Sequence, residues 1–311
     1  MKEFETRIAQ IRDDREHGSR WLVREAILLL RDLASQLLHS SLSPHQQTER
    51  LLTTARELAS LRPAMAALSS AVGHIVAPQP ESMAVLQAAT QLLQTYDTAT
   101  EQIARAAQPS IHGRILTCSI SGTVLEVLQR LHTQIEHVIV TEGRPRYEGR
   151  ETARVLAAHA LPVTLITDAE AAIFLPLCDA VVVGADSILA HGEVINKAGT
   201  ALLAWAAQGY HVPFYVLCES LKISPQNWPG ITPVLLQTTL PLLEEKEPEE
   251  VLEQALSGTH VRNFYFDCTP YPLLTSIISE QGALDLPAIQ TLAATAARNA
   301  QRLSGQAADS L

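Results

Sequence analysis

The first hundred residues carry apolar side chains at helical spacing. Helices are expected over 2–13, over 18–39, from Ser43 with Pro44 behind it, from Pro63, and near 81–107. Between residues 18 and 39 the apolar positions recur three or four apart: Leu22, Ala26, Leu29, Leu30, Leu33 and Leu37. Side chains at that spacing share one face of a helix. The pattern predicts an all-helical domain over 1–110.

A different pattern begins after residue 110, where short apolar runs alternate with amphipathic stretches. Strands are expected over 115–118, 137–140, 162–166, 180–183, 213–217 and 261–266. Helices are expected over 121–131, 147–159, 169–175, 198–208, 271–281 and 287–303. Strands alternating with helices favour parallel pairing through right-handed crossovers. The sequence therefore predicts the α/β class, with a Rossmann-like parallel α/β domain over 111–311 after the helical one.

Composition narrows the classes of function. The chain has 311 residues, 47% of them hydrophobic, and a formal net charge of −10 without a basic block. Nucleic-acid binding needs clustered cations, so no nucleic-acid partner is expected. No apolar run approaches the roughly 20 residues of a membrane span, and the first residues lack the form of a signal peptide. We expect a cytoplasmic protein with no membrane partner.

The cysteines do not suggest a metal centre or a disulfide framework. They lie far apart and form no C-x-x-C pair: Cys118, Cys178, Cys218 and Cys268. Such spacing in a cytoplasmic chain is typical of free thiols. We expect no metal and no cofactor.

In a parallel sheet, ligands bind beyond the carboxyl ends of the strands. The first predicted strand is followed by Ser119, Ser121, Gly122 and Thr123, which are small or hydroxyl-bearing residues at a helix start. Amide groups at a helix N-terminus and nearby hydroxyls suit an anion. Ordinary capping by Ser121 explains one of these residues equally well.

Charged residues follow the next two strands. Arg144 comes after the second and could hold a phosphate through two hydrogen bonds. An ion pair with Glu142 or Glu148 is the competing interpretation. Asp168 follows the third strand, and its predicted role is to cap the helix that starts there.

The fourth strand ends at a candidate general acid–base residue. Asp186 follows an all-apolar run, where desolvation would raise the pKa of its carboxyl group toward the useful range. Asp186 could instead cap a turn. Asn196 and Lys197 are expected to open the helix after it, where an amide, an ammonium and backbone N–H groups would bind phosphate.

Taken together, these segments resemble one superfamily. It contains the regulatory α, β and δ subunits of initiation factor 2B, methylthioribose-1-phosphate isomerase and ribose-1,5-bisphosphate isomerase. The matching stretches are 115–128 (ILTCSISGTVLEVL), 138–149 (VIVTEGRPRYEG), 161–168 (LPVTLITD), 181–200 (VVVGADSILAHGEVINKAGT), 212–222 (VPFYVLCESLK) and 267–282 (DCTPYPLLTSIISEQG).

The resemblance implies a pocket for a sugar phosphate and a homodimer, or higher homo-oligomer, formed through the α/β domain. In the isomerases of the superfamily a cysteine and an aspartate are the catalytic pair, and the substrate is an aldose 1-phosphate. Asp186 matches the catalytic aspartate. Arg144, Asn196 and Lys197 match ligand-binding positions.

Two positions depart from the isomerase pattern. Where those enzymes read Ile-Leu-Thr-His-Cys, this chain has Cys118 at the histidine position and Ser119 at the cysteine position. The Arg-Gly-Ala phosphate loop is replaced by His17, Gly18 and Ser19, with Arg20 next, so Gly18 and Arg20 are the candidates there.

Three functions fit these observations. The first is an isomerase that opens an aldose 1-phosphate to a ketose, with Asp186 moving a proton and Ser119 or Cys118 as its partner. The second is a regulatory protein that senses a sugar phosphate or nucleotide without turnover, which the displaced cysteine favours. The third is a translation factor acting on a protein partner, which kinship of fold alone does not establish.

Overall fold

The computed structural model describes residues 2–14, 18–231, 240–254 and 256–305. The described part of the N-terminal region is helical, as the spacing of its apolar residues predicts. Its helices are α1 Lys2–Asp13, α2 Ser19–Leu38, α3 Pro44–Ser60, α4 Ala66–Val76 and α5 Ser82–Ala107. Ser43 caps α3 through a full capping box with Gln46, which confirms the predicted start. The fourth helix begins three residues after the predicted Pro63.

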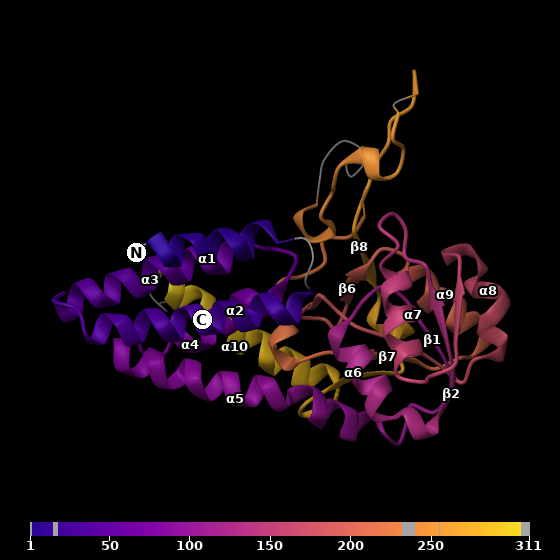
Figure 1. The fold of residues 1–311 in the computed structure, drawn as a ribbon, viewed down its shortest axis with the longest axis horizontal. Helices are drawn as coiled ribbons and strands as arrows, with labels where there is room; N and C mark the ends of the chain where they lie inside the picture. The colour runs from indigo at the N-terminus through magenta and orange to yellow at the C-terminus, as the bar shows by residue number, and fades with distance from the viewer. Residues whose placement is uncertain (1, 15–17, 232–239, 255, 306–311) are drawn as a thin grey trace.

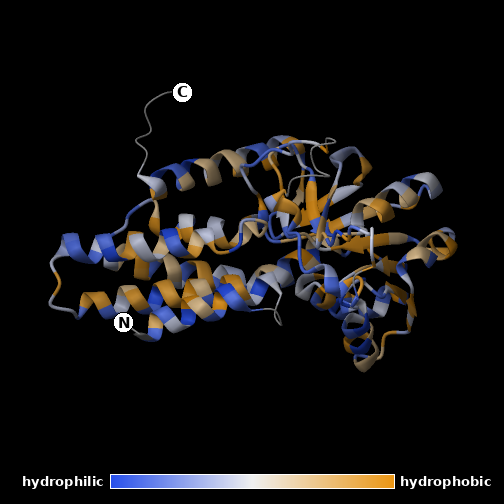
Figure 2. Ribbon diagram, turned by 90° about the horizontal axis from the view of Figure 1, so that it is seen from above, coloured by the Kyte–Doolittle hydropathy of each residue, from blue (hydrophilic) through white to orange (hydrophobic). Residues whose placement is uncertain are grey.

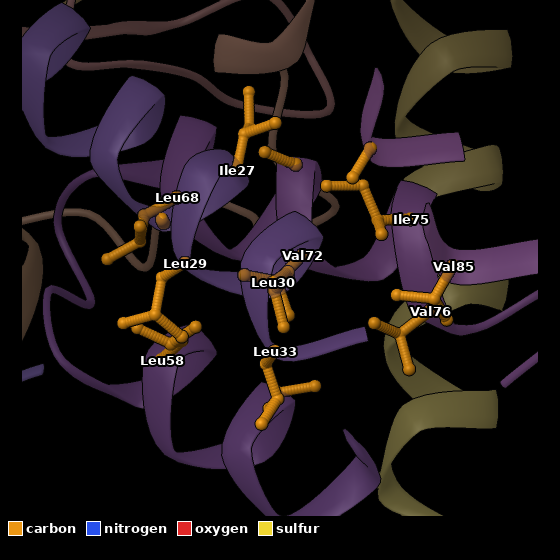
Figure 3. Close-up of a cluster of buried hydrophobic side chains, with 14 of the residues drawn as sticks. Ile27, Leu29, Leu30, Leu33, Leu58, Leu68, Val72, Ile75, Val76 and Val85 are labelled. Atoms are coloured by element: carbon orange, nitrogen blue, oxygen red, sulfur yellow. The ribbon is translucent and has the colours of Figure 1, made fainter. Parts of the chain in front are cut away.

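These helices enclose a dry core made by the apolar face of α2. Ile27, Leu29 and Leu30 are fully buried, and Figure 3 shows Leu29 beside Leu58 of α3 and Leu68 of α4. Burying a side chain of this size stabilises a fold by about 1.5–3 kcal/mol. The helical region therefore has the core that its sequence pattern predicts.

The following region is built on a seven-stranded sheet of order β10-β9-β7-β4-β1-β2-β3 within the described residues. Its strands are β1 Gly113–Thr117, β2 Ile135–Thr141, β3 Val163–Ile166, β4 Ala180–Val183, β7 Phe214–Leu217, β9 Ser276–Ser279 and β10 Gly282–Leu284. All neighbouring pairs are parallel except β9 with β10. The predicted α/β class is confirmed.

Helices cover both faces of this sheet because its central strands are apolar on both sides (Figure 2). In β4, Ala180 and Val182 face the core shared with α5, α6 and α7, whereas Val181 and Val183 face the core shared with α8 and α9. The covering helices are α6 Gly122–Arg130, α7 Glu148–Ala158, α8 Ala171–Phe174 and α9 Thr200–Tyr210.

Two sequence predictions near the C-terminus are wrong. The stretch 261–266 is not a strand of the parallel sheet. Instead β8 Phe266–Thr269 pairs antiparallel with β6 Val194–Lys197, which also pairs with β5 Ser187–Ile188. The helix expected over 271–281 is a single 3-10 turn followed by β9. Pairing with β7 overrides the helical reading because Ile277 and Ile278 are buried in the sheet cores.

The last helix, α10 Leu286–Ser304, connects the two regions (Figure 1). Its first half packs on the sheet through Ile289 and Ala293. Its second half lies against the helical bundle, where the Arg56 guanidinium donates to the Leu303 carbonyl at 2.7 Å. No helix in the described part of the chain is long and apolar enough to cross a membrane.

Candidate functional site

Six parallel strands bring their carboxyl ends to one edge of the sheet, as the alternating pattern predicts. The residues that follow β1, β2, β3, β4 and β7 therefore lie along the same edge of the sheet. They include the hydroxyl-rich turn 118–123, the 142–147 loop, Asp168, Asp186 and Glu219. The smaller sheet adds the end of β6.

The turn after β1 is shaped by close backbone packing. Ser119 adopts a left-handed conformation with φ 61°, and its carbonyl accepts a hydrogen bond from Thr152 at 2.7 Å. Ser121 caps α6 through Val124, as expected. A Cβ on Gly184 would lie 2.6 Å from the Ser121 hydroxyl oxygen, so only glycine allows this approach.

Not every hydroxyl in this turn is available to a ligand. Thr123 is buried and donates to Glu219 at 2.8 Å. The Ser119 side chain is half-buried and has no hydrogen-bond partner among the described residues. Gly122 is exposed at the first position of α6. The free donors of the turn are therefore Ser119 and the start of the helix.

Cys118 is a core residue. It is 8% exposed, and its sulfur lies 3.7 Å from the Thr200 hydroxyl. Burial raises the pKa of the thiol to about 12. The thiolate, which is the reactive form of cysteine, is therefore scarce at neutral pH.

Asp186 is the acid–base candidate with the most suitable environment. Its backbone N–H donates to Ile195, but its half-buried carboxylate accepts no hydrogen bond from the described residues. Burial raises the pKa of this carboxyl to about 6, and the ammonium groups of Lys222 and Lys197 oppose the rise. A carboxyl group poised near neutral pH is suited to proton transfer.

The neighbour of Asp186 ties the sheet to the helical region. The Ser187 hydroxyl donates to the Ala64 carbonyl at 2.7 Å and accepts from the Ala66 amide at 2.9 Å. These bonds hold the 62–66 turn beside Asp186. The helical region therefore forms part of the wall around the candidate site.

This turn lines a cavity of about 390 Å³ with the segment 240–246. Its lining contains Arg12, Arg62 and Lys246 but also Glu244 and Glu245, and Lys246 pairs with Glu244 at 3.0 Å. The Nε of Arg62 is buried without a hydrogen-bond partner. The carboxylate of Glu244, which lines this cavity, contributes to the raised pKa of Asp186. The unpaired Nε of Arg62 is a donor suited to an anionic group.

Asn196 and Lys197 do not open a helix as expected. They end β6, and α9 starts only at Thr200, after Gly199 in a left-handed conformation with φ 109°. The Asn196 amide donates to the Thr200 hydroxyl at 3.0 Å, and the buried Lys197 ammonium lies 2.8 Å from Glu148.

Asp267 occupies the N-terminus of α9. Its carboxylate accepts hydrogen bonds from the amides of Gly199 at 2.7 Å and Ala201 at 3.1 Å. The β6–β8 pairing places Asp267 opposite Asn196, which explains why it reaches this helix. The anion position that we expected at the helix start is thus filled by a side chain of the protein.

Arg144 is an exposed residue of the 142–147 loop. Its guanidinium donates to the Tyr147 hydroxyl at 2.6 Å and weakly to the Val251 carbonyl at 3.4 Å. We expected Asp168 to cap the helix that follows it, but it does not. Its carboxylate instead accepts hydrogen bonds from the amides of Gly143 and Arg144 at 2.9 and 2.8 Å. Thr167 takes the capping position instead.

Gly18 and Arg20 lie at the start of α2. Gly18 is the residue before the helix, and no atom would contact a Cβ there. The Arg20 guanidinium is bound to Glu126 of α6 at 2.6 Å. Arg20 thus links α2 to α6 in this structure. His17 lies outside the described residues.

Sequence reasoning missed Glu219, Lys222, Arg62 and Asp267. Glu219 and Lys222 are 1% and 3% exposed, and the Lys222 ammonium donates to the Ala185 carbonyl at 2.7 Å. A carboxylate directly after the apolar strand 214–217 was a usable signal for Glu219. Within the described residues no group of histidine, cysteine and carboxylate side chains could hold a metal ion, and the four cysteines are free.

The raised pKa of Asp186 predicts an effect on stability. The carboxyl pKa rises from its usual 3.8 to about 6 in the folded state, so the folded protein prefers the protonated form. That preference is fully present below pH 4 and is lost as the pH rises through 6. The ionised carboxylate then costs up to about 3 kcal/mol.

We therefore expect Asp186→Asn to be more stable than the wild type above pH 6, by up to about 3 kcal/mol, with the difference vanishing below pH 4. Urea unfolding between pH 3.5 and 8 measures it. Asp267, whose pKa is also raised to about 6, is present in both proteins and cancels in the difference. The exposed Asp97→Asn is the control, and an equal gain at all pH values would contradict the prediction.

Comparison with known proteins identifies relatives along most of the chain. A family model described as the initiation factor 2 subunit family matches residues 15–286. The ribose 1,5-bisphosphate isomerase of Archaeoglobus fulgidus is 33% identical over 273 residues, which cover 84% of this chain and 85% of that protein. A putative translation initiation factor eIF-2B subunit 2-like protein of Pyrococcus furiosus is 29% identical over 89% of this chain and 94% of its own length.

Solved structures agree with this assignment of the fold. The translation initiation factor eIF-2B of Pyrococcus horikoshii OT3 superposes with a TM-score of 0.76 at 27% identity, covering 91% of this chain and 97% of that one. The 5-methylthioribose 1-phosphate isomerase of the same organism superposes with a TM-score of 0.71 at 24% identity, covering 94% and 87%. At that identity the second match supports the fold alone.

Proposed function

Because the chain belongs to the initiation factor 2 subunit family, we propose that it is a sugar-phosphate isomerase that converts an aldose 1-phosphate into a ketose phosphate. Ribose 1,5-bisphosphate is the first candidate substrate. The relative named for that substrate matches 84% of the chain, whereas a methylthioribose-1-phosphate isomerase of Albidiferax ferrireducens, 39% identical, matches 50%.

The observation that carries the proposal is Asp186. The anomeric oxygen of an aldose 1-phosphate bears the phosphate, so the ring cannot open without an acid at the ring oxygen. Asp186 combines a pKa of about 6 with a carboxylate that is not engaged by the described residues. Its proton goes to the ring oxygen as the bond between C1 and the ring oxygen breaks. The hydrogen on C2 then moves to C1 with its electron pair, and the C2 hydroxyl returns a proton to Asp186 as it becomes the ketone.

Two groups of cations support a phosphorylated substrate. Arg12, Arg62 and Lys246 line the cavity beside the 62–66 turn together with Glu244 and Glu245, and the Arg62 Nε is left without a partner. Lys197 and Arg144 lie at the strand ends with Asn196. A substrate with phosphates at both ends is suited to two such groups, and this favours a bisphosphate over a monophosphate.

Ser119 is the better partner for Asp186 in this proposal. Its hydroxyl is unengaged, and the left-handed turn at φ 61° sets it apart from the strand. Cys118 is instead packed in the sheet core with a thiol pKa of about 12. Ser119 then donates a hydrogen bond to a substrate oxygen, and it does not take the role of a thiolate. Free thiols and a phosphorylated metabolite are both consistent with the cytoplasm.

Proton NMR of the purified protein with ribose 1,5-bisphosphate tests the proposal. We expect loss of the anomeric C1 proton signal and growth of ketose signals, with slower or no conversion of methylthioribose 1-phosphate. Line broadening of the ligand without conversion would instead show a sugar-phosphate sensor and refute the enzyme.

We also propose that the protein is a homodimer formed through its α/β region. Four large apolar side chains are exposed on α8, the adjoining 3-10 turn and α9, which contact one another: Ile173 68%, Leu177 56%, Leu202 68% and Trp205 56%. Such a patch is unusual on a monomer. A second copy related by a two-fold axis would cover it with the same apolar surface.

Leu202→Glu with Trp205→Glu is expected to make the protein monomeric, because each charge would be buried without a partner. The dimer should weaken by at least roughly 100-fold. Sedimentation velocity measures the change. The matched control is Leu256→Glu, which changes an exposed leucine in the loop before β8, outside this apolar patch. A double variant that remains dimeric would exclude this face.

A further inference from the structure

A second cavity lies between the helical region and the C-terminal helix. Its volume of about 540 Å³ is in the range of small-molecule sites. Its walls come from α4, α5 and α10, and from the turns that carry Glu219 and Glu280. Figure 1 shows α10 running beside α4 and α5 where these walls meet. The strand-end residues Asp186, Asn196 and Lys197 do not line it.

A buried hydroxyl group in this cavity lacks a partner. Tyr96 is 3% exposed, lines the cavity, and has no hydrogen bond from its hydroxyl within the described part of the protein. One helical turn further along α5, the fully buried Thr100 hydroxyl is also unpaired. Native proteins rarely leave such groups without a partner, because burial removes the hydrogen bonds they made to water.

The charge of the cavity is negative. Glu219 and Glu280 line it together with one histidine, His74, and none of the described lining residues is a lysine or an arginine. The Oε2 atom of Glu219 is buried without a hydrogen bond, and its nearest ammonium, Lys222, lies 3.6 Å away. Arg20 on α2 is engaged by Glu126. Such a cavity repels phosphate and favours a positively charged ligand.

Part of the remaining wall is apolar. Leu92 and Ala99 of α5 face Leu292 and Ala296 of α10 across the cavity. Small-molecule sites combine such apolar walls with a few convergent polar groups. Here the polar groups with an unpaired atom are the Tyr96 hydroxyl and the Glu219 carboxylate, and neutral side chains such as Gln91 and Asn299 add further polar lining.

We propose that this cavity binds a small organic cation, whose ammonium group donates to Glu219 and Tyr96 while its apolar body lies between α5 and α10. The site contains none of the residues proposed to bind phosphate, although Glu219 also lies at the strand-end edge of the sheet. The inference does not depend on the isomerase proposal, because it rests on a different cavity of opposite charge.

The test uses three compounds with the same indole ring and different charge: tryptamine, tryptophol and indole-3-acetate. Saturation-transfer NMR and calorimetry on the full chain measure binding. Tryptamine should bind at least about tenfold more tightly than neutral tryptophol, and indole-3-acetate should bind more weakly still. Equal affinities, or no binding of tryptamine up to roughly 10 mM, would overturn the proposal.

Variants locate the site. Tyr96→Phe removes one oxygen and should weaken tryptamine binding at least about fivefold, whereas Tyr210→Phe, at an exposed tyrosine on α9, should leave it unchanged. Leu292→Trp should fill the cavity and abolish binding. If that variant fails to fold, Tyr96→Phe still decides the matter, because it changes no packing volume. Unchanged affinity in Tyr96→Phe, or displacement of tryptamine by inorganic phosphate, would refute the assignment.

Discussion

Replacing Asp186 with asparagine is expected to lower kcat for ribose 1,5-bisphosphate by roughly 10²–10⁴-fold while changing KM by less than about threefold. Asparagine keeps the shape of the side chain but cannot deliver a proton to the ring oxygen. The carboxylate accepts no hydrogen bond from the described residues, so the substitution breaks no contact in the fold. Proton NMR of ketose formation gives kcat and KM in the same assay.

The stability measurement separates catalysis from folding for this variant. If Asp186→Asn is less active but more stable above pH 6, the carboxylate takes part in the reaction and its ionised form destabilises the fold. Asp97→Asn at an exposed ion pair with Arg24 should change neither quantity. Retention of more than about one third of kcat in Asp186→Asn would remove Asp186 as the general acid.

Much of the fold followed from the spacing of apolar residues. The run Ala180–Val183 is apolar on both faces, so its place in the centre of a covered parallel sheet could be predicted. The small sheet could not, because β5 has two residues and β6 contains Asn196 and Lys197, which read as a polar helix start. Its strands form only because β8, some 70 residues later, pairs with them.

The sequence predicted the site residues that follow the strands, but not those that tertiary packing brings in from other parts of the chain. Asp186 was found because it ends an apolar strand, and its raised pKa agrees with that reasoning. Arg62 and Asp267 were missed because their positions depend on tertiary packing. The bonds of Ser187 bring the 62–66 turn to the sheet, and the β6–β8 register brings Asp267 to α9. The sequence contains no local signal for either approach.

Lys222→Met is expected to lower the free energy of unfolding by about 3–5 kcal/mol. The Lys222 ammonium and the Glu219 carboxylate are both almost fully buried, 3.6 Å apart, and Lys222 also donates to the Ala185 carbonyl. Methionine fills a similar volume but leaves the Glu219 charge with only the Thr123 hydroxyl as donor. Urea unfolding at pH 7.5 measures the loss.

A second lysine–glutamate pair shows why the loss of unfolding free energy should depend on burial of the pair and not on its distance. Lys246 and Glu244 are closer, at 3.0 Å, but the lysine side chain is 30% exposed against 4% for Lys222. Solvent screens the more exposed pair, so Lys246→Met should cost about 0–1 kcal/mol. Similar losses in the two variants would contradict the argument.

The double variant Lys222→Met with Glu219→Gln separates a missing attraction from a stranded charge. If the cost of Lys222→Met is mainly the uncompensated Glu219 carboxylate, neutralising that carboxylate should restore at least about half of the lost stability. If the losses simply add, the pair contributes through the separate hydrogen bonds to Ala185 and Thr123. Because Lys222 opposes the raised pKa of Asp186, both variants should raise that pKa further, so the stability gain of Asp186→Asn should become larger and should be complete only at a higher pH.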